Sequence, residues 1–190
     1  MTKSNSISSY FENNYGEVFR AIVEAFKPHN AVELGVLNGY SSFHIGVALK
    51  TYGGQLTSYD LFEDYPFRHA SYEEVVHFFR HCENVTIKKW DAWDAHNQHA
   101  QSSVDLLHVD LSNTGETVER VMQLWDEKMV QGGVILFEGG TEERDRVEWM
   151  IKYNARPIKQ EIETNKIIQE KYIYGTYLKF PGLTMLLKKR

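Results

Sequence analysis

A glutamate and two glycines lie close together in the segment Glu33-Leu34-Gly35-Val36-Leu37-Asn38-Gly39-Tyr40-Ser41. Glycine at such a turn lets the backbone bend tightly and approach a ligand closely. Tyr40 and Ser41 begin a helix-like stretch, whose first N–H groups favour an anionic group such as a carboxylate. The segment therefore predicts a binding turn for a nucleotide-type cofactor.

Polar and aromatic residues also follow two other strand-like segments. Asp60 ends the second strand, where its carboxylate can accept hydrogen bonds from both hydroxyls of a ribose. Trp90-Asp91-Ala92-Trp93 follows the third strand, where an aromatic ring can stack against a base. Because ligands of open αβ sheets lie beyond the carboxyl ends of the strands, these residues join the glycine turn in one predicted site.

The glycine turn does not match the dinucleotide-binding pattern G-x-G-x-x-G. The sequence here reads Gly35-Val36-Leu37-Asn38-Gly39. Glu33 would also repel a pyrophosphate, since like charges repel, and it suits a cationic cofactor instead.

Two carboxylates, Asp110 and Glu138, end the fourth and fifth strands. A carboxylate can take a proton from a hydroxyl nucleophile, or it can help to hold a metal ion that activates the hydroxyl. Asp110 and Glu138 are therefore the predicted catalytic residues. His108 lies inside an apolar strand, and we interpret it as a core residue.

Alternating strand-like and helix-like segments position these residues. Parallel strands are expected at 31–34, 56–60, 85–90, 104–110 and 134–137. Apolar strands separated by helices predict a doubly wound α/β sheet. Residues 172–178 and 184–187 also read as strands, and the short connection between them leaves room only for an antiparallel hairpin. We expect a mostly parallel seven-stranded sheet closed by this hairpin.

Three helix starts are predicted from capping patterns. Ser9 with Glu12 predicts a helix that runs to about residue 26, and Ser71 with Glu74 predicts another. Asn113 is the expected cap of the helix after the fourth strand. The apolar stripe of that helix runs on to residue 129.

Length and composition fit one domain of 190 residues with a net charge of −5. We expect an N-terminal helical cover at 1–30, a cofactor-binding core at 31–140, and a helix with the terminal hairpin at 141–190. Few basic clusters argue against nucleic acid as a partner, and no apolar run is long enough to span a membrane. The cytoplasm is the expected location, because no apolar signal core is seen.

The run Val32-Glu33-Leu34-Gly35, followed by Gly39-Tyr40-Ser41, resembles the first motif of class I S-adenosylmethionine-dependent methyltransferases. The resemblance is strongest to the catechol-type O-methyltransferase branch. Residues 104–110 resemble the fourth-strand motif of this family, and Gly132-Gly133-Val134-Ile135 resembles the fifth-strand motif. The closing hairpin is a further family feature, so the resemblance covers nearly the whole chain.

This resemblance implies S-adenosylmethionine as the cofactor. Residues of the glycine turn would meet its methionine part, with Glu33 near the amino group. Residues after the second and third strands would meet its ribose and adenine. The implied cofactor-binding residues are Glu33, Gly35, Gly39, Tyr40, Ser41, Asp60, Leu61, Asp91 and Ala92.

The sequence departs from the catechol branch at the metal site. That branch has an Asp on strand four and an Asp-Asn or Asp-Asp pair after strand five, whereas this chain has Asp110 and Glu138-Gly139-Gly140. Asn113 stands where the branch has a catalytic lysine. Two carboxylates can still bind magnesium weakly, because that ion keeps several waters. Magnesium therefore stays open but is not favoured; no metal ligand is assigned, and catechols are not assigned as substrates.

Methyl transfer to a small-molecule acceptor, at a hydroxyl oxygen, is the expected function. A nicotinamide-dependent oxidoreductase and a cofactor-binding module without catalysis stay open as alternatives. The missing glycine pattern and the hairpin weigh against the first, and the incomplete metal set motivates the second. The aromatic segment 62–69 and the N-terminal helix can cover the site, pack on the core, or pack on a second subunit, so a homodimer also stays open.

Overall fold

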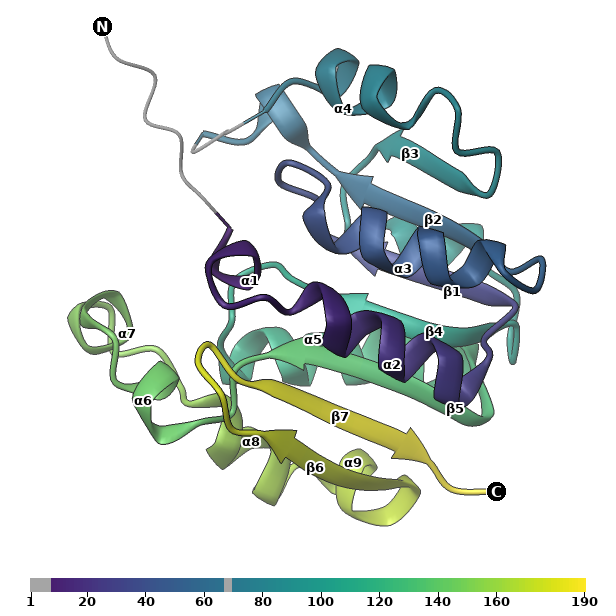
Figure 1. Cartoon of the computed structure of the whole chain (residues 1–190). Helices are drawn as coiled ribbons and strands as arrows, with labels where there is room; N and C mark the ends of the chain where they lie inside the picture. Colours follow the sequence, from purple (N-terminus) through teal and green to yellow (C-terminus); the bar gives the residue numbers. More distant parts are fainter. Residues whose placement is uncertain (1–7, 67–69) are drawn as a thin grey trace, which may run out of the picture. The chain divides into compact units, whose positions relative to one another are not determined.

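A computed structural model describes residues 8–66 and 70–190 (Figure 1). The chain divides into two compact units, one ending at Ala95 and the other beginning at His96. The seven strands found in the described residues belong to one sheet with the order β3-β2-β1-β4-β5-β7-β6. The predicted α/β fold, a mostly parallel sheet closed by an antiparallel hairpin, is confirmed.

In the first unit, three strands pair in parallel with the order β3-β2-β1. Their apolar side chains are buried, and the described residues of the same unit also form four α-helices and a short 3-10 helix. The elements are α1 (Ser9–Glu12), α2 (Gly16–Phe26), β1 (Asn30–Leu34), α3 (Tyr40–Lys50), β2 (Gln55–Asp60), η1 (Phe62–Asp64), α4 (Tyr72–Phe79) and β3 (Val85–Lys89).

The two capping boxes predicted in this unit have different outcomes. Ser71 accepts a hydrogen bond from the Glu74 N–H, and Glu74 bonds back to Ser71, so the box that begins α4 is confirmed. The box at Ser9 is wrong, because α1 begins after Ser8 and has no side-chain cap. The single long helix expected there is also wrong, since Asn14 adopts a φ of 57° and separates α1 from α2.

In the second unit, β4 pairs in parallel with β5, β5 pairs antiparallel with β7, and β7 pairs antiparallel with β6. In Figure 1, α5, α8 and α9 lie together along one face of these strands. The elements are β4 (Val104–Val109), α5 (Gly115–Trp125), η3 (Asp126–Lys128), β5 (Met129–Glu138), α6 (Glu142–Asp145), α7 (Glu148–Lys152), α8 (Ile158–Thr164), α9 (Lys166–Lys171), β6 (Tyr172–Tyr177) and β7 (Leu183–Lys188). A further 3-10 helix, η2, covers Ala95–Gln98.

Two boundaries in this unit correct the sequence prediction. The cap of α5 is Thr114, whose hydroxyl accepts a bond from the Thr117 N–H, and not the neighbouring Asn113. The helix ends at Trp125, so Met129 belongs to β5. The strand predicted at 134–137 is also longer than expected: β5 starts at Met129, and its register with β4 shifts between Met129 and Val134, where Gly132 takes a φ of 79°.

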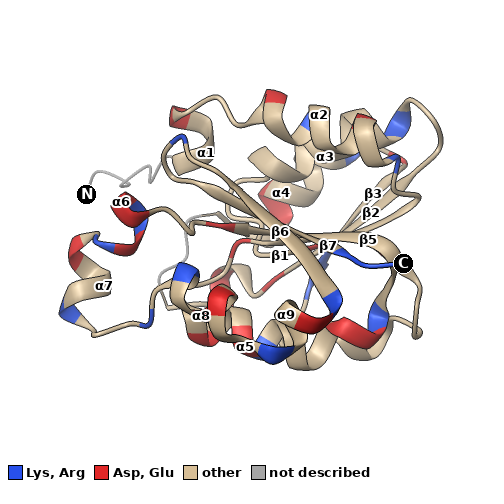
Figure 2. Cartoon of the chain, turned by 90° about the horizontal axis from the view of Figure 1, so that it is seen from below, with Lys and Arg blue, Asp and Glu red and all other residues tan. Residues whose placement is uncertain are grey.

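The second unit is held together by apolar packing beneath a surface of mixed charge. The α5 stripe faces the core, with Val118, Val121, Met122 and Trp125 fully buried. The solvent side of α6, α8 and α9 carries acidic and basic residues together (Figure 2). In the part of the chain that the structure describes, no helix has the length and apolarity needed to cross a membrane.

Candidate active site

Glu33 lies at the centre of the first unit and is fully buried on β1. Its Oε1 accepts a hydrogen bond from the Ser41 hydroxyl at 2.6 Å. Its Oε2 accepts bonds from the Ser58 hydroxyl at 2.7 Å and from the Ser42 hydroxyl. The carboxylate therefore ties β1 to α3 and β2, and these three hydroxyls add no charge to it. Ser42 and Ser58 were not predicted as site residues, although Ser58 is a polar residue inside an apolar strand.

Asp60, at the end of β2, binds the turn that follows β1. Its Oδ2 accepts hydrogen bonds from the backbone N–H groups of Val36 at 2.7 Å and Leu37 at 3.3 Å. Its Oδ1 accepts a bond from the Phe62 N–H at 2.7 Å. The half-buried carboxylate thus fixes the backbone of the glycine turn at the carboxyl end of the parallel strands.

The two glycines of the turn have conformations that other residues rarely adopt. Gly35 has a φ of 89° and Gly39 a φ of 81°. A Cβ atom at Gly39 would also lie 2.7 Å from the ring of Phe79, so both the backbone and the space require glycine there. Gly39 is the N-cap of α3 and provides no side-chain cap, which leaves the first turn of this helix suited to an anionic ligand group.

The side chain of Tyr40 fastens α3 to the N-terminal helices. Its hydroxyl accepts a hydrogen bond from the Gly16 N–H at 3.0 Å, and its ring packs edge-on against Phe11. Tyr10 and Tyr15 are fully buried and pack against each other, while Phe62 packs in the core of the same unit. Tyr10, Tyr15 and Phe62 therefore pack on the core, whereas Phe11 is 58% exposed and Tyr65 is 49% exposed. Residues 67–69 of the predicted cover lie outside the described residues.

The residues predicted to meet the adenine follow β2 and β3. The Trp90 N–H donates to the Asp60 carbonyl at 2.9 Å, which joins the ends of the two strands. The Asp91 carboxylate accepts a bond from the Trp93 N–H at 2.9 Å, and Ala92 is buried. Leu61 is half-buried beside Asp60. The structure therefore brings all nine predicted cofactor-binding residues into the first unit, around the carboxyl ends of its three parallel strands.

The two predicted catalytic carboxylates belong to the second unit. Asp110 follows β4 directly and is half-buried. Glu138 ends β5 and is only 4% exposed. The buried His108 lies on β4, next to the strand end.

Glu138 is held by a cation and an amide. Its Oε1 accepts a hydrogen bond from Arg144 Nε at 3.1 Å and another from Asn113 Nδ2 at 2.9 Å. Arg144 itself is 9% exposed, and its guanidinium lies over the ring of Trp149. Arg144 was not predicted as a site residue, because it stands in a run of charged residues that reads as a solvated surface.

These contacts argue against a divalent metal ion at the end of β5. Glu138 forms an ion pair with Arg144, so a metal ion would compete with a guanidinium for the same carboxylate. Gly139 has no side chain to supply a ligand. Among residues 8–66 and 70–190, no group of three or more His, Cys, Asp or Glu side chains is arranged to hold a metal ion. The donor set does not fit magnesium.

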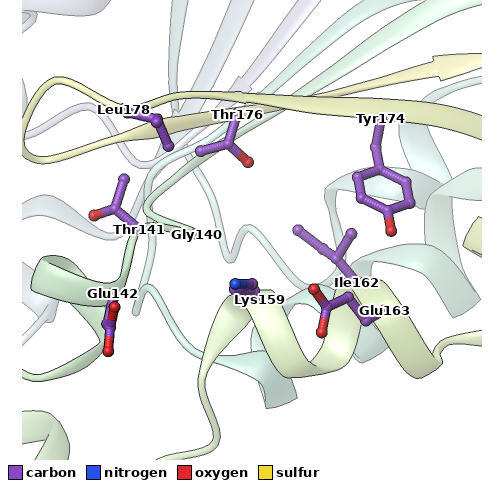
Figure 3. A pocket seen from close by; sticks show the side chains of 9 residues that line it. All are labelled: Gly140, Thr141, Glu142, Lys159, Ile162, Glu163, Tyr174, Thr176 and Leu178. Atoms are coloured by element: carbon purple, nitrogen blue, oxygen red, sulfur yellow. The ribbon is translucent and has the colours of Figure 1, made fainter.

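A cavity of about 420 Å³ lies in the second unit, beside the loop that follows Glu138 (Figure 3). Figure 3 shows Lys159 and Glu163 of α8 on one side of it and Tyr174 and Thr176 of β6 on the other. Such a volume is typical of small-molecule sites.

Comparison with protein families gives a match over residues 32–138, more than half of the chain, to a family described as a methyltransferase domain. The chain belongs to this family. The matched segment runs from β1, with its glycine turn, to Glu138 at the end of β5. The resemblance drawn from the sequence motifs is therefore confirmed.

Solved methyltransferase structures share the fold. An O-methyltransferase from Bacillus cereus, in complex with S-adenosylhomocysteine, is 18% identical with a TM-score of 0.66, covering 98% of this chain and 84% of its own. The methyltransferase PaMTH1 from Podospora anserina is 14% identical with a TM-score of 0.66, covering 97% and 80%. The O-methyltransferase TomG from Streptomyces achromogenes is 13% identical with a TM-score of 0.66, covering 98% and 82%. Comparison with curated proteins gives no match.

Proposed function

We propose that this methyltransferase transfers a methyl group from S-adenosylmethionine to a hydroxyl oxygen of a small molecule. The observation that carries the cofactor assignment is the arrangement at the carboxyl ends of β1 and β2. There, a glycine-capped helix and the carboxylate of Asp60 meet at one turn. The solved structures of similar fold support this choice, because PaMTH1 and the Bacillus protein hold S-adenosylhomocysteine and TomG holds S-adenosylmethionine.

The residues of the turn fit the parts of this cofactor. The first turn of α3 would receive the methionine carboxylate, since the helix N-terminus carries a partial positive charge. Asp60 would accept hydrogen bonds from the ribose hydroxyls. A carboxylate offers about four acceptor positions, and three are taken by backbone N–H groups. A ribose that donates two bonds would therefore replace at least one of these three bonds.

The cofactor supplies a methyl group on a positively charged sulfur, which is already a good leaving group. The remaining work of the protein is to align the acceptor oxygen with that methyl group and to remove the proton of the hydroxyl. We assign the removal of this proton to Asp110, because it directly follows the central strand β4 and is half-buried. The cavity beside the loop after Glu138 has the size of a small-molecule site, but neither Asp110 nor Glu138 lines it, so it does not carry this assignment.

A ligand-binding screen followed by an activity assay tests this function. We expect S-adenosylmethionine and S-adenosylhomocysteine to raise the melting temperature, and methyl transfer to occur to members of a panel of hydroxylated small molecules. The absence of stabilisation by either ligand at millimolar concentration would contradict the proposal. Stabilisation by NAD alone would favour the oxidoreductase, and cofactor binding without any methylated product across the panel would favour a module without catalysis.

A further inference from the structure

We propose that the terminal amino groups of Arg144 bind the acceptor oxygen and stabilise its negative charge, the role that a divalent metal ion would otherwise have. This inference rests on the proposed methyl transfer to oxygen. It also follows from the residues at the end of β5, which do not supply the ligands that a divalent metal ion needs.

The guanidinium of Arg144 carries more hydrogen-bond donors than its protein partners use. It carries five N–H donors, of which the Nε–H donates to Glu138. In the described part of the chain, no hydrogen bond from its two terminal amino groups to another residue is found. Arg144 as a residue is 9% exposed, but its terminal nitrogens are not among the buried atoms that lack a partner, so they reach the surface, where a ligand can approach them. Hydrogen bonds from a guanidinium to an oxyanion are charge-assisted, and they are stronger than bonds between neutral groups.

The position of Arg144 is fixed from three sides. Its backbone N–H donates to the Thr141 hydroxyl at 3.2 Å, which caps the short helix α6. The Glu138 carboxylate holds Nε, and the ring of Trp149 lies 5.3 Å from the centre of the guanidinium. A group held in this way needs little reorganisation when charge develops on a bound oxygen.

Gly139 explains how the guanidinium replaces a metal ligand. A Cβ atom at Gly139 would lie 3.4 Å from Cγ of Arg144 and 3.0 Å from Cδ1 of Ile158. Its φ of 106° also disfavours any side chain. The missing ligand after Glu138 and the buried arginine are therefore linked, because the stem of Arg144 and Ile158 occupy the space beside this glycine.

Methyl transfer to the bound oxygen then needs no metal ion. The acceptor O–H gives its proton to the carboxylate of Asp110, and Arg144 favours this by lowering the pKa of the hydroxyl. A lone pair of the oxygen forms the new C–O bond as the C–S bond breaks. The sulfur keeps that electron pair and becomes the neutral thioether of S-adenosylhomocysteine.

Binding of 4-nitrophenol tests the anion site without any methyl transfer, because its ionised form absorbs at a different wavelength from its neutral form. Bound to the wild-type protein, its pKa should fall by about 1–3 units, the effect of an adjacent opposite charge. Arg144→Gln should abolish the shift, and Arg144→Lys should restore part of it. Arg146→Gln is the matched control, since that exposed side chain pairs with Glu142 and should leave the shift unchanged. An unshifted spectrum with the wild type, or an equal shift with Arg144→Gln, overturns the proposal.

Two further measurements separate this proposal from alternatives. Arg144→Gln leaves the buried Glu138 carboxylate without its cation, which can destabilise the fold. The double variant Arg144→Gln/Glu138→Gln removes both charges, and it should also show no shift in the pKa of 4-nitrophenol. Mn²⁺ alone, followed by its electron paramagnetic resonance signal, should not bind the wild type. Stoichiometric Mn²⁺ binding that is lost in Glu138→Gln overturns the replacement of the metal. Every variant should still bind S-adenosylhomocysteine. Loss of that binding in the wild type would contradict the proposed cofactor, not the anion site.

Discussion

Glu33 and Asp60 in the first unit are stabilised by other groups than Glu138 and Asp126 in the second unit. In the first unit, Glu33 is held by serine hydroxyls and Asp60 by backbone N–H groups. In the second unit, Glu138 forms an ion pair with Arg144, and Asp126 forms ion pairs with Lys171 and Lys188. Hydroxyl and amide donors fix a carboxylate without neutralising it, whereas cations fix it and cancel its charge.

This difference matches the two partners of the proposed reaction. S-adenosylmethionine is a cation with ribose hydroxyls to donate, so carboxylates that keep their charge suit the unit that would hold it. An acceptor hydroxyl becomes negative as it reacts, so a buried cation suits the unit that carries Asp110. The identity of the groups that balance each carboxylate thus indicates which charge the ligand brings.

Replacement of Asp60 is the strongest test of this comparison on the cofactor side. Asp60→Ala should weaken binding of S-adenosylhomocysteine about 100-fold, because a hydrogen bond to a charged group contributes about 1.5–3 kcal/mol and the carboxylate would serve two hydroxyls. Isothermal titration calorimetry measures the change. The affinity of Asp60→Asn, which keeps one acceptor oxygen, should lie between those of the wild type and Asp60→Ala. Equal affinities in all three proteins would remove Asp60 from the cofactor site.

Replacement of Glu33 tests whether the three serine hydroxyls around it need a carboxylate as their acceptor. Glu33→Gln places an NH₂ donor among three serine hydroxyls, so at least one buried group loses its acceptor. We expect the free energy of unfolding to fall by about 2 kcal/mol, measured by urea denaturation. Glu17→Gln, in an exposed pair with Arg20, should change it by less than about 0.5 kcal/mol. Similar losses for both variants would show that burial of Glu33 is not the cause.

Asp126 gives a pH test of the cation-balanced carboxylates. Burial alone would raise the pKa of Asp126, but hydrogen bonds from Lys171 and Tyr172 and the charge of Lys188 together lower the pKa. A carboxyl whose pKa is lowered by folding stabilises the protein above its unfolded pKa of about 4, and the stabilisation is lost as the pH falls through the folded pKa.

Asp126→Asn should therefore lower the melting temperature by several degrees at pH 7 and flatten its decline between pH 5 and pH 3. Thermal unfolding followed by circular dichroism across that range measures both effects. A decline as steep as that of the wild type would assign the acid sensitivity to other carboxylates.

The strands and the closing hairpin were predictable because their apolar runs and short connection leave few ways to pair. The glycine turn was predictable because its residue types are needed locally. The partner of Glu138 was not, since Arg144 reaches it through the short helix α6, and nothing in a run of alternating charges distinguishes a buried arginine from exposed ones. The break at Asn14 was missed because the helix was predicted from its expected cap alone, although asparagine is one of the residues that adopt a positive φ most often.

The cap of α5 shows the same limit on a smaller scale and gives the last prediction. Asn113 and Thr114 are both good caps by type, and only the structure shows that Thr114 caps the helix while Asn113 donates to Glu138. Thr114→Ala should lower the free energy of unfolding by about 1 kcal/mol, and Thr114→Ser should nearly preserve it, since serine keeps the accepting hydroxyl. Urea midpoints with unchanged slopes measure the difference. Equal losses in the two variants would mean that the methyl group of Thr114, and not its hydroxyl, sets the start of α5 and thereby the place of Asn113 beside Glu138.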